Sequence, residues 1–205
     1  MSASLVGSEM CIRDRNISEK TCAETRIIMN QYTIRHAVDS DKERICEIYA
    51  FARKFMAENG NPNQWKNNNP SREIIDNDIA AGNLYVIEEA DKEQQTEGTD
   101  NKNSRVHGVF FFKMGEDATY NVIEDGSWLS GDTYGTIHRV AGDGQVHGVL
   151  TMAVQFCEQK IKHLRIDTHN DNKIMQHVIE KNGFKRCGII HVKDGSERIA
   201  YEKLG

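Results

Sequence analysis

The sequence predicts a mixed α/β fold, because strand-like and helix-like segments alternate along a chain of 205 residues. Residues 32–37 alternate apolar and polar side chains, which is typical of a half-buried strand. Residues 45–56 instead place apolar side chains at helical spacing. Residues 137–141 form an apolar segment that turns through glycines into a predicted helix over 146–160. Together these segments favour helices packed against a sheet.

The remaining elements are predicted from caps and turn residues. Ser40 and Glu43 have the spacing of a capping box at the start of the first helix, and Asn59-Gly60 ends that helix. A second helix is predicted from Pro70-Ser71 to residue 81. Further strands are predicted over 84–88, 106–112, 164–169, 184–191 and 197–203, and a last helix runs from Asn172 to Asn182-Gly183. The predicted order is therefore β-α-α-β-β-β-α-β-α-β-β.

Two segments are set apart from the predicted domain, which spans 29–205. Residues 1–15 resemble a translated sequencing adapter, so we interpret 1–28 as a non-native or disordered extension and Met29 as the start. An amphipathic helix over 17–29 is the alternative. Residues 90–105 are polar and lack apolar periodicity, which predicts a disordered hairpin insertion. A functional lid is the alternative for that insertion.

Composition limits the class of protein. Hydrophobic residues make up 38% and charged residues 28%, and no apolar segment is long enough to cross a membrane. A formal charge of −5 argues against nucleic acid as a partner. The five cysteines form no C-x-x-C pair and are odd in number, which predicts reduced thiols and a cytoplasmic protein. The histidines have no metal-ligand spacing, so we expect no metal.

Two motifs carry the functional prediction. In residues 142–148, glycines follow a predicted strand and precede a predicted helix. Such a turn directs free backbone N–H groups toward one point and suits a diphosphate. Asn172 begins the second motif, which ends at Gly183-Phe184. A plain helix with an Asn N-cap and a Gly stop explains this second motif equally well.

In their order along the chain, the two motifs resemble the GNAT superfamily of acyl-CoA-dependent N-acyltransferases. Gln145 and Gly148 match the family's coenzyme signature, whereas Leu150 departs from the small residue expected there. The resemblance implies a mixed, mostly antiparallel central sheet with flanking helices, splayed between strands four and five. It also implies acetyl-CoA as co-substrate. The residues expected to bind it are Val140, Gln145, Val146, His147, Gly148, Val149 and Asn172.

The resemblance also directs attention to strand four. Backbone N–H groups near His138 and Val140 are expected to polarise the acetyl carbonyl, and the usual acidic Tyr is replaced by Ile179. His138 is the candidate base, because its ordinary pKa of about 6.5 suits proton removal and its side chain is predicted to share a face with Val140. Asp167 and His169 are predicted to share a face at the end of strand five. A structural role for His138, and an ion pair of Asp167 with Arg139 or Arg165, are the alternatives.

Aromatic residues in polar segments are the candidates for acceptor binding. Trp65 lies in the loop 61–69, and Tyr120 and Trp128 are predicted to be exposed in the irregular segment 117–132. The resulting prediction is an N-acetyltransferase that moves an acetyl group directly to a primary amine of a small molecule or peptide, without a covalent enzyme intermediate. The negative charge favours a cationic acceptor. The alternative is an inactive acyl-CoA-binding regulatory module, and the last strands offer an edge for a homodimer.

Overall fold

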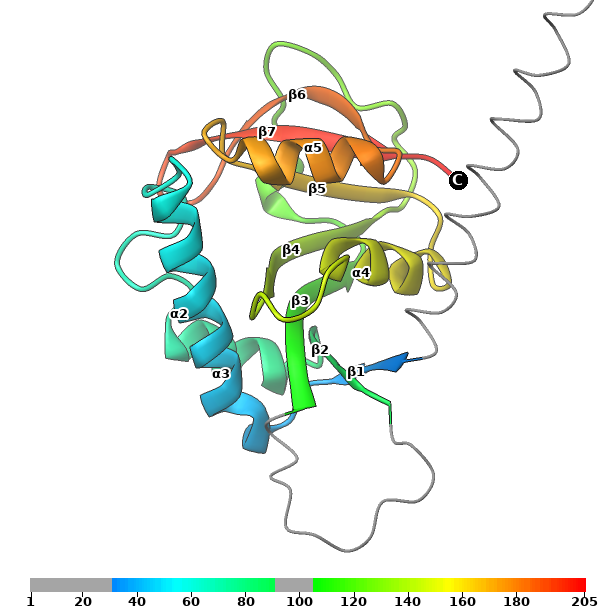
Figure 1. The fold of residues 1–205 in the computed structure, drawn as a ribbon. Helices are drawn as coiled ribbons and strands as arrows, with labels where there is room; N and C mark the ends of the chain where they lie inside the picture. Colours follow the sequence, from blue (N-terminus) through cyan, green and yellow to red (C-terminus); the bar gives the residue numbers. More distant parts are fainter. Residues whose placement is uncertain (1–30, 91–104) are drawn as a thin grey trace, which may run out of the picture.

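The computed structural model describes residues 31–90 and 105–205, and contains a seven-stranded sheet covered by helices on both faces (Figure 1). The predictions for residues 1–28, and nearly all of those for 90–105, lie outside these ranges. The strands are ordered β1-β2-β3-β4-β5-β7-β6, and only β4 and β5 run parallel. The elements are β1 (Tyr32–His36), η1 (Asp39–Asp41), α2 (Lys42–Glu58), α3 (Arg72–Ala80), β2 (Leu84–Glu89), β3 (Val106–Met114), η3 (Ala118–Tyr120), β4 (Gly135–Gly142), α4 (Val149–Glu158), β5 (Leu164–Thr168), α5 (Lys173–Lys181), β6 (Lys185–His191) and β7 (Glu197–Lys203).

The predicted order of helices and strands is confirmed, with shifts at some ends. The helix predicted after Ser40 begins at Lys42, behind the short η1 turn. The helix predicted from residue 146 begins at Val149, because Gly148 has a left-handed backbone and interrupts it. Ser71 caps α3 through the Ile74 N–H, and Asn172 caps α5 through the Met175 N–H.

Each face of the sheet has its own apolar core. The apolar stripe of α2, with Ile45 and Ile48 fully buried, packs with α3 on one face. On the other face α4 and α5 contribute Met152 and Ile179. Because a strand alternates its side chains between faces, these two cores determine where each β4 residue points.

A bulge in β4 changes that alternation at the centre of the sheet. Phe111 pairs with His138 and Val109 with Ala141, so β4 carries one residue more than β3 over this stretch. Arg139 takes a φ of 51°, which is strained for a residue with a Cβ. The Tyr49 hydroxyl donates to the Arg139 carbonyl at 3.1 Å, and the Arg139 guanidinium pairs with Asp78. These contacts hold the strained conformation in place.

The bulge also makes one prediction wrong. Val140 packs against the core of α4 and α5, whereas the His138 ring lies 5.9 Å from Phe111 in the direction of the opposite core. The two side chains therefore lie on opposite faces, because the extra residue shifts the alternation by one position.

Candidate active site

A cavity of about 670 Å³ opens where β4 and β5 separate. The parallel ladder between them comprises Gly135–Ile137 on β4 and Leu164–Ile166 on β5, and the strands diverge beyond it. This confirms the predicted splay. The cavity is bounded by the loop before α3, by α3 and α5, and by the β6–β7 turn. Its lining includes Gln64, Trp65, Lys66, Asn69, Asn77, Asp78, Thr119, His138, Arg139, Val140, Asp167, Thr168, Met175, Lys193, Asp194 and Arg198.

His138 lies at the edge of this cavity between two carboxylates. Its Nδ1 is 3.1 Å from Asp167 Oδ1, and its Nε2 is 3.3 Å from Asp117 Oδ2. The Tyr120 hydroxyl donates to the same Asp167 oxygen at 2.8 Å. We call Asp117, Tyr120, His138 and Asp167 the pocket cluster.

The two carboxylates determine the charge of His138. Burial alone lowers its pKa, but the hydrogen bonds and negative charges of Asp167 and Asp117 raise the pKa of His138 to about 9. In turn, the hydrogen bond with His138 lowers the pKa of Asp117 far below its ordinary value. Burial raises the pKa of Asp167, yet the bonds from His138 and Tyr120 outweigh it and the net pKa is lowered. His138 is therefore protonated at neutral pH, and the sequence-based argument from an ordinary histidine pKa does not hold.

The structure separates the two residues predicted at the end of β5. Asp167 is buried against His138, whereas His169 lies beyond β5 and its Nδ1 faces Asp171 at 3.5 Å. His169 does not line the cavity. The alternative partners of Asp167 are also wrong, because Arg139 pairs with Asp78 and Arg165 pairs with Glu202.

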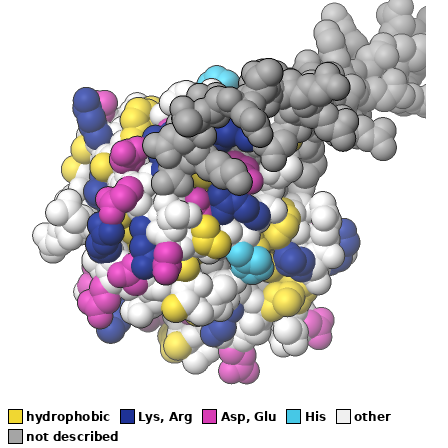
Figure 2. All heavy atoms as spheres, turned by 90° about the horizontal axis from the view of Figure 1, so that it is seen from below, with side chains coloured by type: hydrophobic (Ala, Val, Ile, Leu, Met, Phe, Trp, Pro, Cys, Tyr) yellow, Lys and Arg dark blue, Asp and Glu magenta, His cyan; other side chains and the backbone are white. Residues whose placement is uncertain are grey.

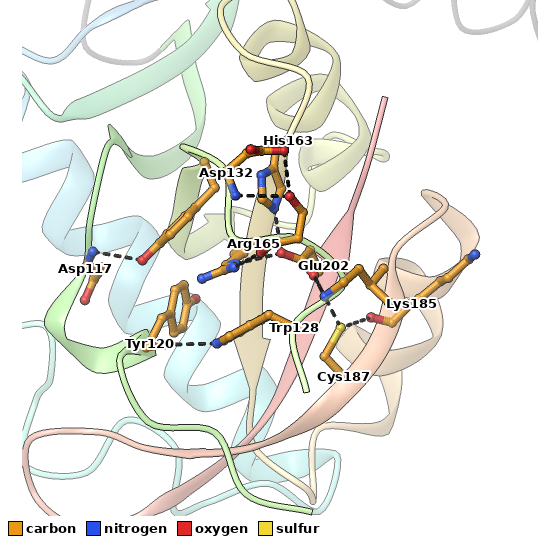
Figure 3. Close-up of polar contacts among 12 residues, drawn as sticks. Asp117, Tyr120, Trp128, Asp132, His163, Arg165, Lys185, Cys187 and Glu202 are labelled. Atoms are coloured by element: carbon orange, nitrogen blue, oxygen red, sulfur yellow. Dashed lines mark hydrogen bonds and ion pairs between the residues drawn. The ribbon is translucent and has the colours of Figure 1, made fainter. Parts of the chain in front are cut away.

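Only one of the three predicted acceptor-binding aromatics lines the cavity. Trp65 does so, and packs edge-on against Tyr49 with ring centroids 5.4 Å apart. Tyr120 is only 2% exposed, so its predicted exposure is wrong. The Trp128 indole N–H donates to the Tyr120 carbonyl, and the Arg165 guanidinium stacks on the Trp128 ring at 3.9 Å. Tyr120 and Trp128 therefore pack against each other instead of lining the cavity, and Trp128 also packs against the Arg165 charge (Figure 3).

The start of α4 has the features of an anion site. Gly148 is the N-cap with a φ of 79°, and no side chain caps the helix there. A Cβ at Gly148 would meet nothing within 4 Å, so the backbone is approachable from outside. Uncapped N–H groups and the helix dipole favour a phosphate at such a position. Gln145, Val146, His147 and Val149 lie around this turn, outside the cavity lining, whereas Val140 lines the cavity.

Three residues singled out by sequence have structural roles. Leu150 is 3% exposed and turns into the core, so it does not crowd the approach to Gly148. Ile179 is fully buried in the same core. Asn172 caps α5, and its Nδ2 donates to Gln64 Oε1 at 2.8 Å. The structure thus places Asn172 against the loop that borders the cavity, outside the lining itself.

Sequence reasoning missed several residues of the site. Asp117 comes from an irregular segment and contacts His138 across 21 residues of chain. Asp78 and Arg198 are distant in sequence from both motifs. Asp117 had a partial sequence signal, because an Asp before a short helix is a typical cap. In the structure its side chain accepts from the Thr119 N–H and caps η3.

Comparison with solved structures identifies the fold. A GNAT-family acetyltransferase from Streptococcus agalactiae is 28% identical, with a TM-score of 0.68 over 85% of this chain and 95% of its own. The chain is a member of the GNAT superfamily. A GNAT-family acetyltransferase from Listeria monocytogenes is 18% identical with a TM-score of 0.58, over 85% of this chain and 95% of its own. Arabidopsis thaliana NAA60, solved with acetyl-CoA, is 12% identical with a TM-score of 0.52, over 84% of this chain and 98% of its own.

No family model matches this GNAT-superfamily chain, and neither does any curated protein sequence. No helix within 31–90 or 105–205 is long and apolar enough to span a bilayer. The described residues also contain no group of three or more His, Cys, Asp or Glu placed to hold a metal ion.

Figure 2 shows one face of the molecule, partly covered by undescribed atoms. On the part that is visible, Lys and Arg side chains interleave with Asp and Glu.

Proposed function

We propose that this GNAT-superfamily protein is an N-acetyltransferase that moves an acetyl group directly from acetyl-CoA to a primary amine. The observation that carries the proposal is the cavity at the β4–β5 separation, bordered by Asp167, His138 and the bulged backbone of β4. Acetyl-CoA supplies an acetyl thioester when bound. Its diphosphate fits the uncapped start of α4 at Gly148, and its acyl end fits the cavity beside Val140.

The residues around the cavity then handle the amine. Asp167 is a buried carboxylate that lines the cavity, and both His138 and Tyr120 hold it ionised. It is suited to receive an amine and to orient it. Both ring nitrogens of His138 face carboxylates, so the proton that the attacking nitrogen loses reaches His138 through Asp167 as CoA leaves as its thiolate, and this requires the neutral form of His138. With a pKa of about 9, about one molecule in a hundred holds that form at pH 7.

The positions and pKa values of the cysteines support direct transfer of the acetyl group from the thioester to the amine. None of Cys46, Cys157 and Cys187 lines the cavity. Burial raises the pKa of the Cys157 thiol above its usual range and that of Cys187 to about 11. Protonated thiols are poor nucleophiles, so an acetyl-cysteine intermediate is disfavoured.

The test is the release of free CoA from acetyl-CoA in the presence of a library of primary amines. Turnover should depend on the amine, and kcat/KM should rise with pH toward a pKa of about 9. An acceptor whose amine pKa is below 7 is already neutral above pH 7. Any rise of kcat/KM with pH above pH 7 is then due to a group of the protein. An inactive acyl-CoA-binding module, favoured by the buried Ile179 in place of a tyrosine, would be stabilised by acetyl-CoA without turnover.

The coenzyme site can be tested separately with Gly148→Glu. A carboxylate at this position repels the diphosphate and the positive φ strains any side chain, so acetyl-CoA affinity should fall at least about 100-fold. Isothermal titration measures the affinity, and Gly195→Ala, also at positive φ but in the β6–β7 turn, controls for strain. Unchanged affinity in Gly148→Glu would place the diphosphate elsewhere.

A further inference from the structure

The cavity contains a buried arginine that forms an ion pair with no described carboxylate. Arg198, on β7, is 7% exposed and lines the cavity. Its Nη1 donates to Ser196 Oγ at 2.9 Å and to the Glu197 carbonyl at 2.8 Å, and its Nη2 to the Gln64 carbonyl at 3.5 Å. Within 31–90 and 105–205 it forms no ion pair, although every other buried arginine or histidine does. A buried, unpaired guanidinium is costly unless a ligand anion completes it.

The remaining donors of Arg198 suit a carboxylate. All its hydrogen bonds within the described residues go to neutral oxygens and use Nη1 and Nη2, which leaves Nε–H without a described acceptor. An arginine that keeps Nε and part of Nη2 available can hold a carboxylate with two parallel hydrogen bonds. Arg198 also borders a smaller cavity of about 290 Å³, but the Gln64 contact places its guanidinium toward the main one.

Sheet register puts this arginine on the same face as the proposed amine-binding carboxylate. Asp167 pairs with Ala200 across β5 and β7, so the two share a face. Arg198 lies two residues along β7 from Ala200, and alternate residues of a strand also share a face. A separation of two residues along β7 corresponds to about 7 Å. One small molecule can therefore contact both the Arg198 and the Asp167 side chains.

The two ends of the cavity carry opposite charge. Lys66, Lys193 and Asp194 line the end at Arg198. The Asp194 carboxylate already accepts from the backbone N–H and hydroxyl of Ser196. At the other end, the carboxylates of Asp78, Asp117 and Asp167 outnumber the positive charges of His138 and Arg139. The net charge of the chain favours a cationic acceptor, and the polarity of the cavity favours one that also carries a negative group.

Resting on the proposed function, we propose that the acceptor is an amine that also carries a carboxylate, such as a free amino acid, and that Arg198 binds that carboxylate. The amine then lies toward Asp167 and His138 and the carboxylate toward the β6–β7 turn. Fixing both ends orients the nitrogen toward the separated strands.

The experiment compares matched acceptors that differ only at the acid group. Each amino acid is assayed beside its amide and its decarboxylated amine, with acetyl-CoA and detection of released CoA. We expect kcat/KM for the acid to exceed that for the amide by about 10- to 100-fold, the range for a lost hydrogen bond to a charged group. Arg198→Gln should lower the acid to the level of the amide and leave the amide within about 3-fold. Arg198→Lys should keep part of the preference, because it keeps the charge but not the bidentate geometry.

Arg186→Gln is the matched control, because it removes the same charge from an exposed position of the same hairpin, outside the main cavity. It should leave the preference unchanged. Equal turnover of acids, amides and amines, or a preference that survives Arg198→Gln, overturns the proposal while the acetyltransferase stands. If no amine is turned over, thermal unfolding with the same compounds and CoA decides: stabilisation by acids in the wild type but not in Arg198→Gln supports the Arg198 site alone, and its absence rejects the site.

Discussion

His138 and His163 each contact carboxylates, yet only His138 borders the main cavity. In the pocket cluster, His138 lies between Asp117 and Asp167 at the open end of the β4–β5 pair. In the other, which we call the sealed cluster, Glu202 is fully buried and accepts from His163, Arg165 and the Leu129 N–H (Figure 3). The comparison separates charge that maintains the fold from charge that is available to a ligand.

The carboxylate of the sealed cluster is fully paired without a ligand. Glu202 receives four donors, the fourth being the Cys187 thiol at 3.9 Å. The Arg165 guanidinium also donates to the Ser130 carbonyl and stacks on Trp128 and Tyr134. Burial raises the pKa of Glu202, but the hydrogen bonds from His163, Leu129 and Arg165 outweigh it and the net pKa is lowered. None of Glu202, Arg165 and His163 lines the main cavity.

Breaking the sealed cluster should give the largest effect. Glu202→Gln leaves the buried Arg165 charge unpaired, so we expect a loss of about 3–5 kcal/mol in the free energy of unfolding. Urea denaturation at pH 7 measures it. Glu197→Gln, at an exposed position of the same strand, should change stability by less than about 0.5 kcal/mol. A loss as small as that control would mean that Glu202 does not hold this region together.

The pH dependence of stability should distinguish the clusters next. The folded pKa of His138, about 9, lies above its unfolded value of about 6.5, so its stabilising contribution is complete below pH 6.5 and disappears as pH rises through 9. The shift corresponds to at most about 3 kcal/mol. Asp117, Asp167 and Glu202 have lowered pKa values, so their contributions are present near neutrality and are lost only as pH falls through the acid range.

Urea denaturation between pH 6.5 and 9.5 therefore measures the contribution of the pocket cluster to stability. In His138→Gln the free energy of unfolding should depend less on pH over that range. A wild-type slope that persists in the variant would assign the titration to another group.

Removing His138 should affect catalysis more than coenzyme binding. We expect His138→Gln to lower kcat/KM by about 100-fold, as for loss of a general base, while the Kd for acetyl-CoA changes by less than about 3-fold. His163→Gln is the matched variant, since it removes a buried carboxylate-bound histidine from the sealed cluster. It should lower the melting temperature with kcat/KM unchanged for folded protein. Equal rates for the wild type and His138→Gln would remove His138 from the reaction.

The fold was predictable from sequence where local patterns suffice. Ile45, Ile48 and Tyr49 recur at helical spacing, Ser71 and Asn172 cap their helices, and Gly183 ends α5 at a φ of 86°. Each of these signals depends on residues a few positions apart. The splay between β4 and β5 followed from the family resemblance, since both motifs occur in family order.

The charges of the site depend on packing between distant segments and could not be predicted in that way. Nothing in the sequence marks Arg139 for a positive φ, and that bulge reversed the expected side of Val140 relative to His138. Tyr120 lies in a polar segment that suggested exposure, but the Trp128 ring, 5.3 Å from its own, helps to bury it. The raised pKa of His138 likewise requires Asp117, 21 residues earlier, to reach it.

The smallest expected effect concerns the hydroxyl that supports Asp167. Tyr120→Phe removes the donor at 2.8 Å from a buried carboxylate that keeps only His138, so we expect a loss of about 1–2 kcal/mol in stability. The pKa of Asp167 should rise, and kcat/KM should fall a few-fold as the carboxylate becomes less well oriented. Tyr85→Phe is the control, because the Tyr85 ring packs among Phe110 and Phe156 with no described partner for its hydroxyl. If Tyr120→Phe matched Tyr85→Phe in both measurements, Asp167 would depend on His138 alone.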